Sequence, residues 1–336
     1  MFRLIHLSDV HLGPLPRVRR RDLVSKRITG YVNWHRNRRD AMGGETLEKL
    51  ITHVQAARPD HIVITGDLVN LALDAEISIM ADWLSSVGAP RSVTVVPGNH
   101  DTYVPGALAA IKKAWRPFMS GDGADQVAFP FIRLRGDAAG ETPIAIVGTN
   151  SGRATAPFLA TGSFRDKQAN MLRDHLRSLA LERRFRVVLI HHPPFKGATS
   201  WNKRLIGSSR FRGVIEDAGA ELVLHGHTHI ESDETIPGPC QAVRVIGVPS
   251  ASHESSALAA PTAVGPGPAK SKSGGNGKPG AQYNLFDISQ PSADGGWRVR
   301  WRQHGYGDGS HTVQELKRSD FTVPSAVPVR NPRGST

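Results

Sequence analysis

Five short polar clusters combine carboxylate, imidazole and amide side chains in the first 230 residues of this 336-residue chain. In sequence order they are Asp9-Val10-His11, Gly66-Asp67, Gly98-Asn99-His100-Asp101, His191-His192-Pro193 and His225-Gly226-His227-Thr228-His229. Imidazole nitrogens mixed with carboxylate and amide oxygens, without a thiolate, suit manganese, iron, zinc or cobalt, whereas calcium prefers oxygen ligands alone. The clusters therefore predict a transition-metal site.

The number of available ligands indicates two ions rather than one. Taking one side chain at each plausible position gives seven ligands: Asp9, His11, Asp67, Asn99, His191, His227 and His229. Seven ligands fit two ions that share a bridging carboxylate and each keep an open position for water. Two cations about 3.5–4 Å apart can clamp a phosphoryl group and generate a hydroxide nucleophile. The predicted reaction is therefore hydrolysis of a phosphoester by a metal-bound hydroxide.

Each cluster follows a short apolar run that is typical of a strand. The runs cover residues 2–7, 61–65, 92–96, 186–190 and 221–224. Segments 45–57 and 164–182 carry apolar residues at helical spacing, so strands and helices alternate and α/β layering is favoured. Ligands bind beyond the carboxyl ends of strands in such sheets. We therefore expect the five clusters to meet at one edge.

The ordered set D-x-H, G-D, G-N-H-D, H-x-P and G-H-x-H resembles the calcineurin-like metallophosphoesterase superfamily. Its GNHD and HHPP forms are similar to the bacterial cyclic-nucleotide-phosphodiesterase-like branch. The resemblance implies a four-layer αββα sandwich, in which two mixed β-sheets pack face to face with helices outside.

The resemblance also implies a role for each site residue. One ion would be held by Asp9, His11, Asp67 and His229, and a second by Asp67 as the bridge with Asn99, His191 and His227. His100 would be the catalytic histidine that stabilises the transition state or protonates the leaving oxygen. Asp101 would orient His100. The cofactors would be two ions of Mn²⁺, Fe²⁺/Fe³⁺ or Zn²⁺.

Other candidate residues are interpreted as structural. His192 and His225 each adjoin a ligand and are left outside the predicted site, His6 is taken as a structural residue, and Cys240 as inert. The non-enzyme alternative is a binding scaffold on the same fold. Such a protein should have lost ligands, whereas this chain keeps all seven.

The charge of the chain is concentrated in one segment. The net charge is +12, and residues 17–39 hold nine arginines and lysines against one acid, Asp22, with Ile28, Tyr31, Val32 and Trp34 among them. Such a segment could lie on an anionic lipid surface, which would suit a phospholipid or lipid-linked phosphodiester as substrate. It could instead bind nucleic acid, or be a solvated basic face. The accompanying apolar residues favour lipid over nucleic acid, while a cyclic nucleotide phosphodiesterase or a nuclease remains the alternative function.

The rest of the sequence limits the class of protein and its domain organisation. A single cysteine excludes an intrachain disulfide scaffold, and no apolar run reaches the length of a membrane span. Arg3, His6 and Asp9 interrupt the N-terminal apolar stretch and argue against a signal peptide. We therefore expect a cytoplasmic protein, with contact to the inner face of the membrane through residues 17–39. We expect one domain over 1–317, with a basic insertion at 17–40 and a flexible Gly/Pro/Ser-rich loop at 252–281. Late antiparallel strands are expected at 283–288 and 297–303. Residues 318–336 are expected to be a loose tail.

Overall fold

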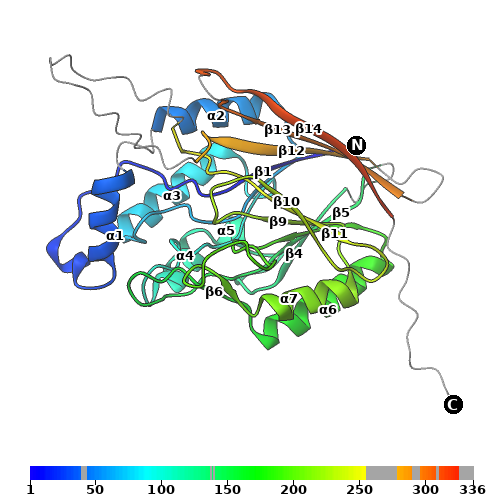
Figure 1. Ribbon diagram of the computed structural model, residues 1–336, viewed down its shortest axis with the longest axis horizontal. Coiled ribbons are helices and arrows are strands. Elements are labelled where there is room, and N and C mark those ends of the chain that lie inside the picture. The colour runs from blue at the N-terminus through cyan, green and yellow to red at the C-terminus, as the bar shows by residue number, and fades with distance from the viewer. Residues whose placement is uncertain are drawn as a thin grey trace.

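The computed structural model describes residues 1–38, 44–136, 138, 141–254, 278–289, 296–307 and 310–324. Two six-stranded sheets stack face to face (Figure 1). The first sheet has the order β14 (Gln314–Pro324), β13 (Gly296–Gly305), β12 (Gln282–Ser289), β1 (Phe2–Leu7), β2 (His61–Ile64) and β3 (Val93–Val95). The second has the order β10 (Ser232–Ile236), β11 (Val243–Gly247), β9 (Leu222–His225), β7 (Phe185–Leu189), β5 (Ile144–Gly148) and β4 (Phe131–Arg135).

Both sheets are mixed. In the first, β1, β2 and β3 are parallel, and β12, β13 and β14 continue from β1 as antiparallel neighbours. In the second, β11, β9, β7 and β5 are parallel, with antiparallel β10 and β4 at the two edges. The predicted late antiparallel pair is therefore confirmed as β12 and β13. A separate parallel pair joins β6 (Gly162–Ser163) to β8 (Leu205–Ile206).

Helices cover the outer face of each sheet. The buried apolar residues of α2 (Gly44–Ala56), α3 (Asp74–Val87), α4 (Ala107–Ala114) and α5 (Arg116–Met119) pack on the first sheet. Those of α6 (Asp166–Leu181) and α7 (Ser208–Ala218) pack on the second. A third apolar cluster lies between the sheets. The expected four-layer sandwich of two mixed sheets and flanking helices is confirmed.

Burial on both faces explains why the strands are continuous apolar runs. In β7, Phe185, Val187 and Leu189 point into the layer between the sheets, whereas Val188 points toward α6 and α7. Side chains alternate across a strand, so each face of β7 needs its own apolar residues. The strand is thereby fixed in register, and the residues that follow it emerge at a defined edge.

The expectation of a loose tail from residue 318 is wrong for 318–324. These residues form the second half of β14, where Val323 pairs with Trp297 and both are buried between the sheets. Charged side chains such as Lys317 and Arg318 made this strand difficult to predict from the sequence, although charged residues are common on exposed edge strands. Ser252 and Ala281, within the expected 252–281 loop, are buried. Residues 255–277 and 325–336 lie outside the described part of the chain.

The basic insertion is folded over its described part, residues 17–38. It forms a 3-10 turn η1 (Arg20–Leu23), helix α1 (Arg27–Asn33) and a π turn η2 (Trp34–Arg38). The Arg27 guanidinium donates hydrogen bonds to the carbonyl oxygens of Leu71 and Ala72. These contacts hold α1 against the segment that follows β2.

Candidate metal centre

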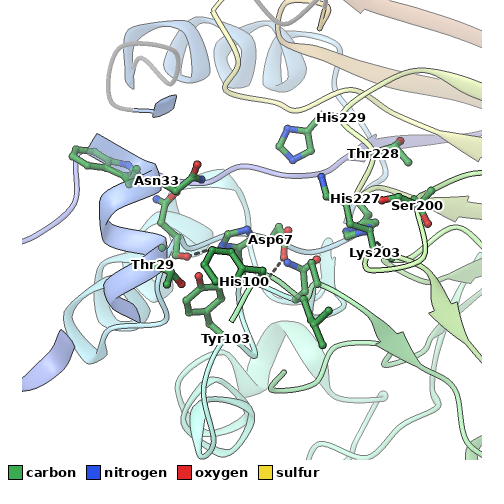
Figure 2. A pocket seen from close by; sticks show the side chains of 18 of the residues that line it. Thr29, Asn33, Asp67, His100, Tyr103, Ser200, Lys203, His227, Thr228 and His229 are labelled. Carbon is green, nitrogen blue, oxygen red and sulfur yellow. Dashed lines mark hydrogen bonds between the residues drawn. The ribbon is translucent and has the colours of Figure 1, made fainter. Parts of the chain in front are cut away.

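The structure brings all seven predicted ligands together at the ends of five strands. Asp9 and His11 follow β1, Asp67 follows β2, Asn99 follows β3, His191 follows β7, and His227 and His229 follow β9. Three of these strands belong to the first sheet and two to the second, so both sheets supply ligands. Figure 2 shows Asp67, His227 and His229 converging on one pocket. The roles of the individual ligands remain predictions.

A first group of side chains surrounds Asp9. The Asp9 Oδ1 atom lies 3.0 Å from His229 Nε2, and His229 Nε2 lies 3.3 Å from His11 Nε2. His11 Nε2 is 3.9 Å from Asp67 Oδ2. The ligand atoms of Asp9, His11 and His229 all lie within 4.8 Å of one another, which is compact enough to hold one ion.

A second group shares Asp67 with the first. Asp67 Oδ2 lies 3.3 Å from His191 Nε2, which is 3.2 Å from Asn99 Oδ1. The His227 ring lies 5.1 Å from that of His191, and its Nε2 donates to the Lys203 carbonyl oxygen at 2.9 Å, which leaves Nδ1 to face a metal. Asp67 therefore occupies the position that a bridging carboxylate requires.

Backbone carbonyl groups orient two of the ligand rings. The Nδ1 atom of His191 lies 2.6 Å from the Thr65 carbonyl oxygen, and that of His11 lies 3.2 Å from the Val69 carbonyl oxygen. A ring nitrogen that donates to a carbonyl carries the hydrogen, so the opposite Nε2 has its lone pair available for a metal.

The charges of the cluster fit a metal. Burial alone disfavours a charged imidazole at His191, but the Asp67 and Asp9 carboxylates outweigh it and raise the pKa of His191 to about 9. Burial raises the pKa of the Asp67 carboxyl, yet His191 and His100 hold it well below its usual range. Asp9 Oδ1 is buried without a hydrogen bond of normal geometry. A divalent ion would supply the positive charge that this pocket favours and would displace the His191 proton.

The backbone at the ligands is strained. Nine non-glycine residues of the described chain have φ between +42° and +71°, and five of them are predicted ligands: Asp9, His11, Asp67, His227 and His229. Residues with side chains rarely adopt this left-handed conformation, and it persists where the surroundings hold it for function. Sequence reasoning could not detect this feature.

Two glycines permit the close approach of the strand ends. A Cβ atom at Gly226 would lie 2.5 Å from Asp9 Oδ2, and one at Gly98 would lie 2.5 Å from the Asp67 nitrogen. Both distances are shorter than real Cβ contacts allow, so glycine is required for the ligands to meet.

His100 lies beside the two groups. Its Nδ1 atom is 2.6 Å from the Asn70 carbonyl oxygen, and its backbone amide donates to Asp67 Oδ1 at 2.6 Å. Its ring lies parallel to that of Tyr103, with centroids 5.3 Å apart (Figure 2). His100 is thus held at the wall of the pocket by a carbonyl group and an aromatic ring.

The expectation that Asp101 orients His100 is wrong. The Asp101 carboxylate instead accepts hydrogen bonds of 2.8–3.2 Å from four backbone amides, those of Asp67, Leu68, Val69 and Gly98. Burial raises the pKa of Asp101 to about 7, while the amides favour its ionised form. Asp101 connects the loop that carries Asp67 to the loop that carries Asn99. The Asn70 carbonyl oxygen, rather than Asp101, contacts the His100 ring.

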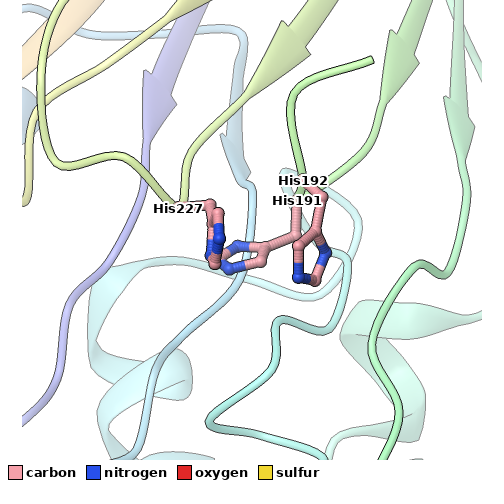
Figure 3. A group of neighbouring side chains, drawn as sticks. All are labelled: His191, His192 and His227. Carbon is pink, nitrogen blue, oxygen red and sulfur yellow. The ribbon is translucent and has the colours of Figure 1, made fainter. Parts of the chain in front are cut away.

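The neighbouring histidines have protein partners. His192 lies next to His191 and His227 (Figure 3), but its Nδ1 contacts Ser151 Oγ and its Nε2 the Ala160 carbonyl oxygen. His225 Nε2 contacts Ser232 Oγ at 2.9 Å. His6 Nε2 contacts Thr65 Oγ1 at 2.9 Å, in agreement with a structural role.

A cavity of about 520 Å³ extends outward from the cluster. Thr29 and Asn33 of the basic insertion line one wall, and Ser200 and Lys203 belong to the opposite wall (Figure 2). Trp34 of the insertion also lines the cavity. Lys26, Asn70 and Tyr103 also line it, and none was selected from the sequence as a site residue. No sequence pattern marks these residues, because Lys26 is one of many cations in its segment and Asn70 acts through its backbone carbonyl.

Two stacked mixed sheets with a His/Asp cluster at their strand ends define a class of metal-dependent phosphoesterase. The sequence matches the family model of the calcineurin-like phosphoesterases over residues 2–231. The chain therefore belongs to the calcineurin-like phosphoesterase family. The narrower likeness to the bacterial cyclic-nucleotide-phosphodiesterase-like branch stays a prediction.

Solved structures share the fold at low sequence identity. A dimetal phosphatase from Danio rerio is similar over 96% of this chain and 99% of its own, with 12% identity and a TM-score of 0.58. Purple acid phosphatase PPD1 from yellow lupin (Lupinus luteus) is similar over 96% of this chain and 53% of its own, with 11% identity and a TM-score of 0.52. No curated protein matches the sequence. Within the described residues, no helix combines the length and apolar character of a membrane span.

Proposed function

We propose that this protein hydrolyses phosphodiesters at a two-metal site. The observation that carries the proposal is the shape of the cavity, which continues from the His/Asp cluster to α1 on one side and to residues 198–203 on the other. A diester has an organic group on each side of its phosphorus, so it needs space in both directions. A monoester needs only one.

The residues present fit two ions of manganese, iron or zinc. Asp9, His11, Asp67 and His229 would hold one, and Asp67, Asn99, His191 and His227 the other. When bound, such ions polarise the phosphorus centre and make a hydroxide nucleophile available at neutral pH.

His100 would handle the leaving group. Its Nδ1 hydrogen is directed to the Asn70 carbonyl oxygen, so Nε2 is the ring atom that can exchange a proton with the leaving oxygen. The Tyr103 ring fixes the plane of the imidazole by stacking on it. A correctly placed acid of this kind contributes about 10²–10⁴-fold to the rate.

A panel of esters tests this reaction. Protein reconstituted with manganese, iron or zinc is assayed against bis(p-nitrophenyl) phosphate, p-nitrophenyl phosphate, a cyclic nucleotide, a glycerophospholipid and single-stranded DNA. We expect the diesters to be hydrolysed faster than the monoester. Preference for the monoester would overturn the diesterase proposal, and preference for the cyclic nucleotide or DNA would favour the alternative substrates.

We further propose that the substrate is a phospholipid or lipid-linked phosphodiester, met by a cytoplasmic protein at the inner face of a membrane. Large apolar side chains are exposed at the cavity and in segments that contribute to it: Phe158 lines the cavity and is 82% exposed, Trp201 follows the lining residue Ser200 and is 71% exposed, and Val24 of the basic insertion is 85% exposed. Ile28, one turn from Val32 on α1, is also exposed. Arg20 and Arg21 lie in the same insertion and would pair with lipid phosphates.

Sedimentation with vesicles tests the lipid surface. The wild-type protein should sediment with phosphatidylglycerol vesicles, and the Val24→Ser/Ile28→Ser variant should sediment less. Leu181→Ser, at a 68% exposed position on α6, is the matched control and should behave as wild type. Absence of wild-type binding, combined with salt-sensitive binding to single-stranded DNA, would favour nucleic acid instead.

A further inference from the structure

We propose that Lys26 binds a second anionic group of the substrate, next to the scissile phosphate. This inference rests on the proposed phosphodiesterase function and names a feature of its substrate. The substrate class is a phosphodiester whose organic group carries another negative charge, such as a phosphate or a carboxylate.

The position of Lys26 places it close to the chemistry. Its Nζ lies 4.4 Å from the centroid of the Tyr103 ring, which stacks in turn on His100. The Nζ group also donates to Thr155 Oγ1 at 2.6 Å and to the Leu159 carbonyl oxygen at 2.7 Å. Lys26 and His100 therefore both contact the Tyr103 ring and both line the cavity.

The Lys26 ammonium is half-buried with neutral partners. Within the described residues, no carboxylate forms an ion pair with Lys26, and its two hydrogen bonds go to a hydroxyl and a carbonyl group. Burial lowers the pKa of Lys26 to about 8, and the charge of Asp67 only partly opposes this. A cation removed from water without an anion costs free energy, and such groups in clefts are candidates for ligand binding.

The rest of the cavity favours an anion. Lys203 lines the wall opposite α1, and Lys278 also lines the cavity. Asp67 is the one acid among the described residues that line the cavity, and it belongs to the metal cluster. The outer cavity thus presents cations and neutral polar groups such as Thr29, Asn33 and Ser200. A second anion would find complementary charge there.

A purely structural role does not explain the charge. The bonds to Thr155 and Leu159 fasten the insertion to the opposite loop, but a neutral donor could make them without burying a cation. The structural and the binding role make different predictions for substrates that differ only in charge.

Three p-nitrophenyl phosphodiesters provide the test: the ester of glycerol, the same ester with a second phosphate on the glycerol, and the ester of choline. With metal-reconstituted wild type, kcat/KM should rank the bisphosphate first, glycerol second and choline last. In Lys26→Met the bisphosphate should lose about 10–100-fold in kcat/KM, the usual effect of losing a charged hydrogen bond. The glycerol ester should lose no more than about threefold, the effect expected when only an anchor of α1 is removed. Lys26→Arg should keep most of the bisphosphate preference.

Lys167→Met, at an exposed position on α6, is the matched control and should match wild type with every ester. Equal losses for all three esters in Lys26→Met would show a structural role and overturn the inference, as would a wild type without charge preference. Hydrolysis of none of the esters by wild type with any of the metals would instead refute the proposed function. The glycerol ester thus separates the two failures.

Discussion

The two ends of the cavity are built differently. At the metal end, ligands emerge from buried strands and are fixed by backbone carbonyls, by the Asp101 carboxylate and by strained φ angles. At the α1 end, no residue of Arg27–Asn33 is buried. Hydrogen bonds of Lys26 and Arg27 to loop carbonyls and the packing of Tyr31 on the core hold this helix. From this difference we expect the reaction to depend on the buried sheets and substrate choice to depend on the more exposed insertion.

The largest expected effect comes from removing a ligand at the metal end. Asn99→Ala and His227→Ala should each lose bound metal and more than about 100-fold in activity, beyond the 10–100-fold typical of residues that only support a ligand. Elemental analysis and diester hydrolysis check this together. Full activity in either variant would contradict the assignment of that residue.

The Asp101 tie between the two ligand loops should come next. Asp101→Asn leaves four backbone amides with a weaker acceptor, so we expect about 1–3 kcal/mol lower stability and weaker metal binding. Urea unfolding and metal titration measure the two effects. Asp82→Asn, at an exposed position on α3, is the control. An equal loss of stability in this variant would show that Asp101 has no special role.

Acid should destabilise the sheets beneath the metal end. Burial lowers the pKa of His6 to about 3, whereas the unfolded chain has an ordinary histidine. The contribution of neutral His6 to the free energy of unfolding is therefore fully present above about pH 6.5. It is lost as the pH falls toward 3, by about 1.4 kcal/mol per pH unit, because the unfolded chain takes up a proton that the folded chain does not. In metal-free protein, His6→Gln should flatten this part of the stability curve. The exposed residue His311, replaced by Gln, should leave the slope unchanged.

The smallest expected effect is at the α1 anchor. Arg27→Ala removes the bonds to the Leu71 and Ala72 carbonyls, so α1 should exchange its amide hydrogens faster. We expect KM for the diester to rise about threefold with kcat and metal content nearly unchanged, as for loss of uniform binding. Arg298→Ala, exposed on β13, is the control. A fall in kcat or in metal content would mean that the two ends are not independent.

The two ends also differ in how far the sequence predicts them. The metal end was predictable because each ligand directly follows an apolar run, and strand ends in such sheets meet at one edge. The partner of His100 was not, because the Asn70 carbonyl is a backbone group with no sequence signal. Lys26 was likewise one of many cations until folding placed it over Tyr103. Strand β14 was missed because edge strands tolerate charge.

The central claim is a two-metal centre bridged by Asp67. The most direct measurement is the number of manganese, iron or zinc ions bound per chain, followed during titration of metal-free protein together with hydrolysis of bis(p-nitrophenyl) phosphate. We expect two ions per chain, activity that rises with the second ion, and loss of both in Asp67→Asn. Saturation at a single ion, or activity that persists in the metal-free protein, would contradict the account.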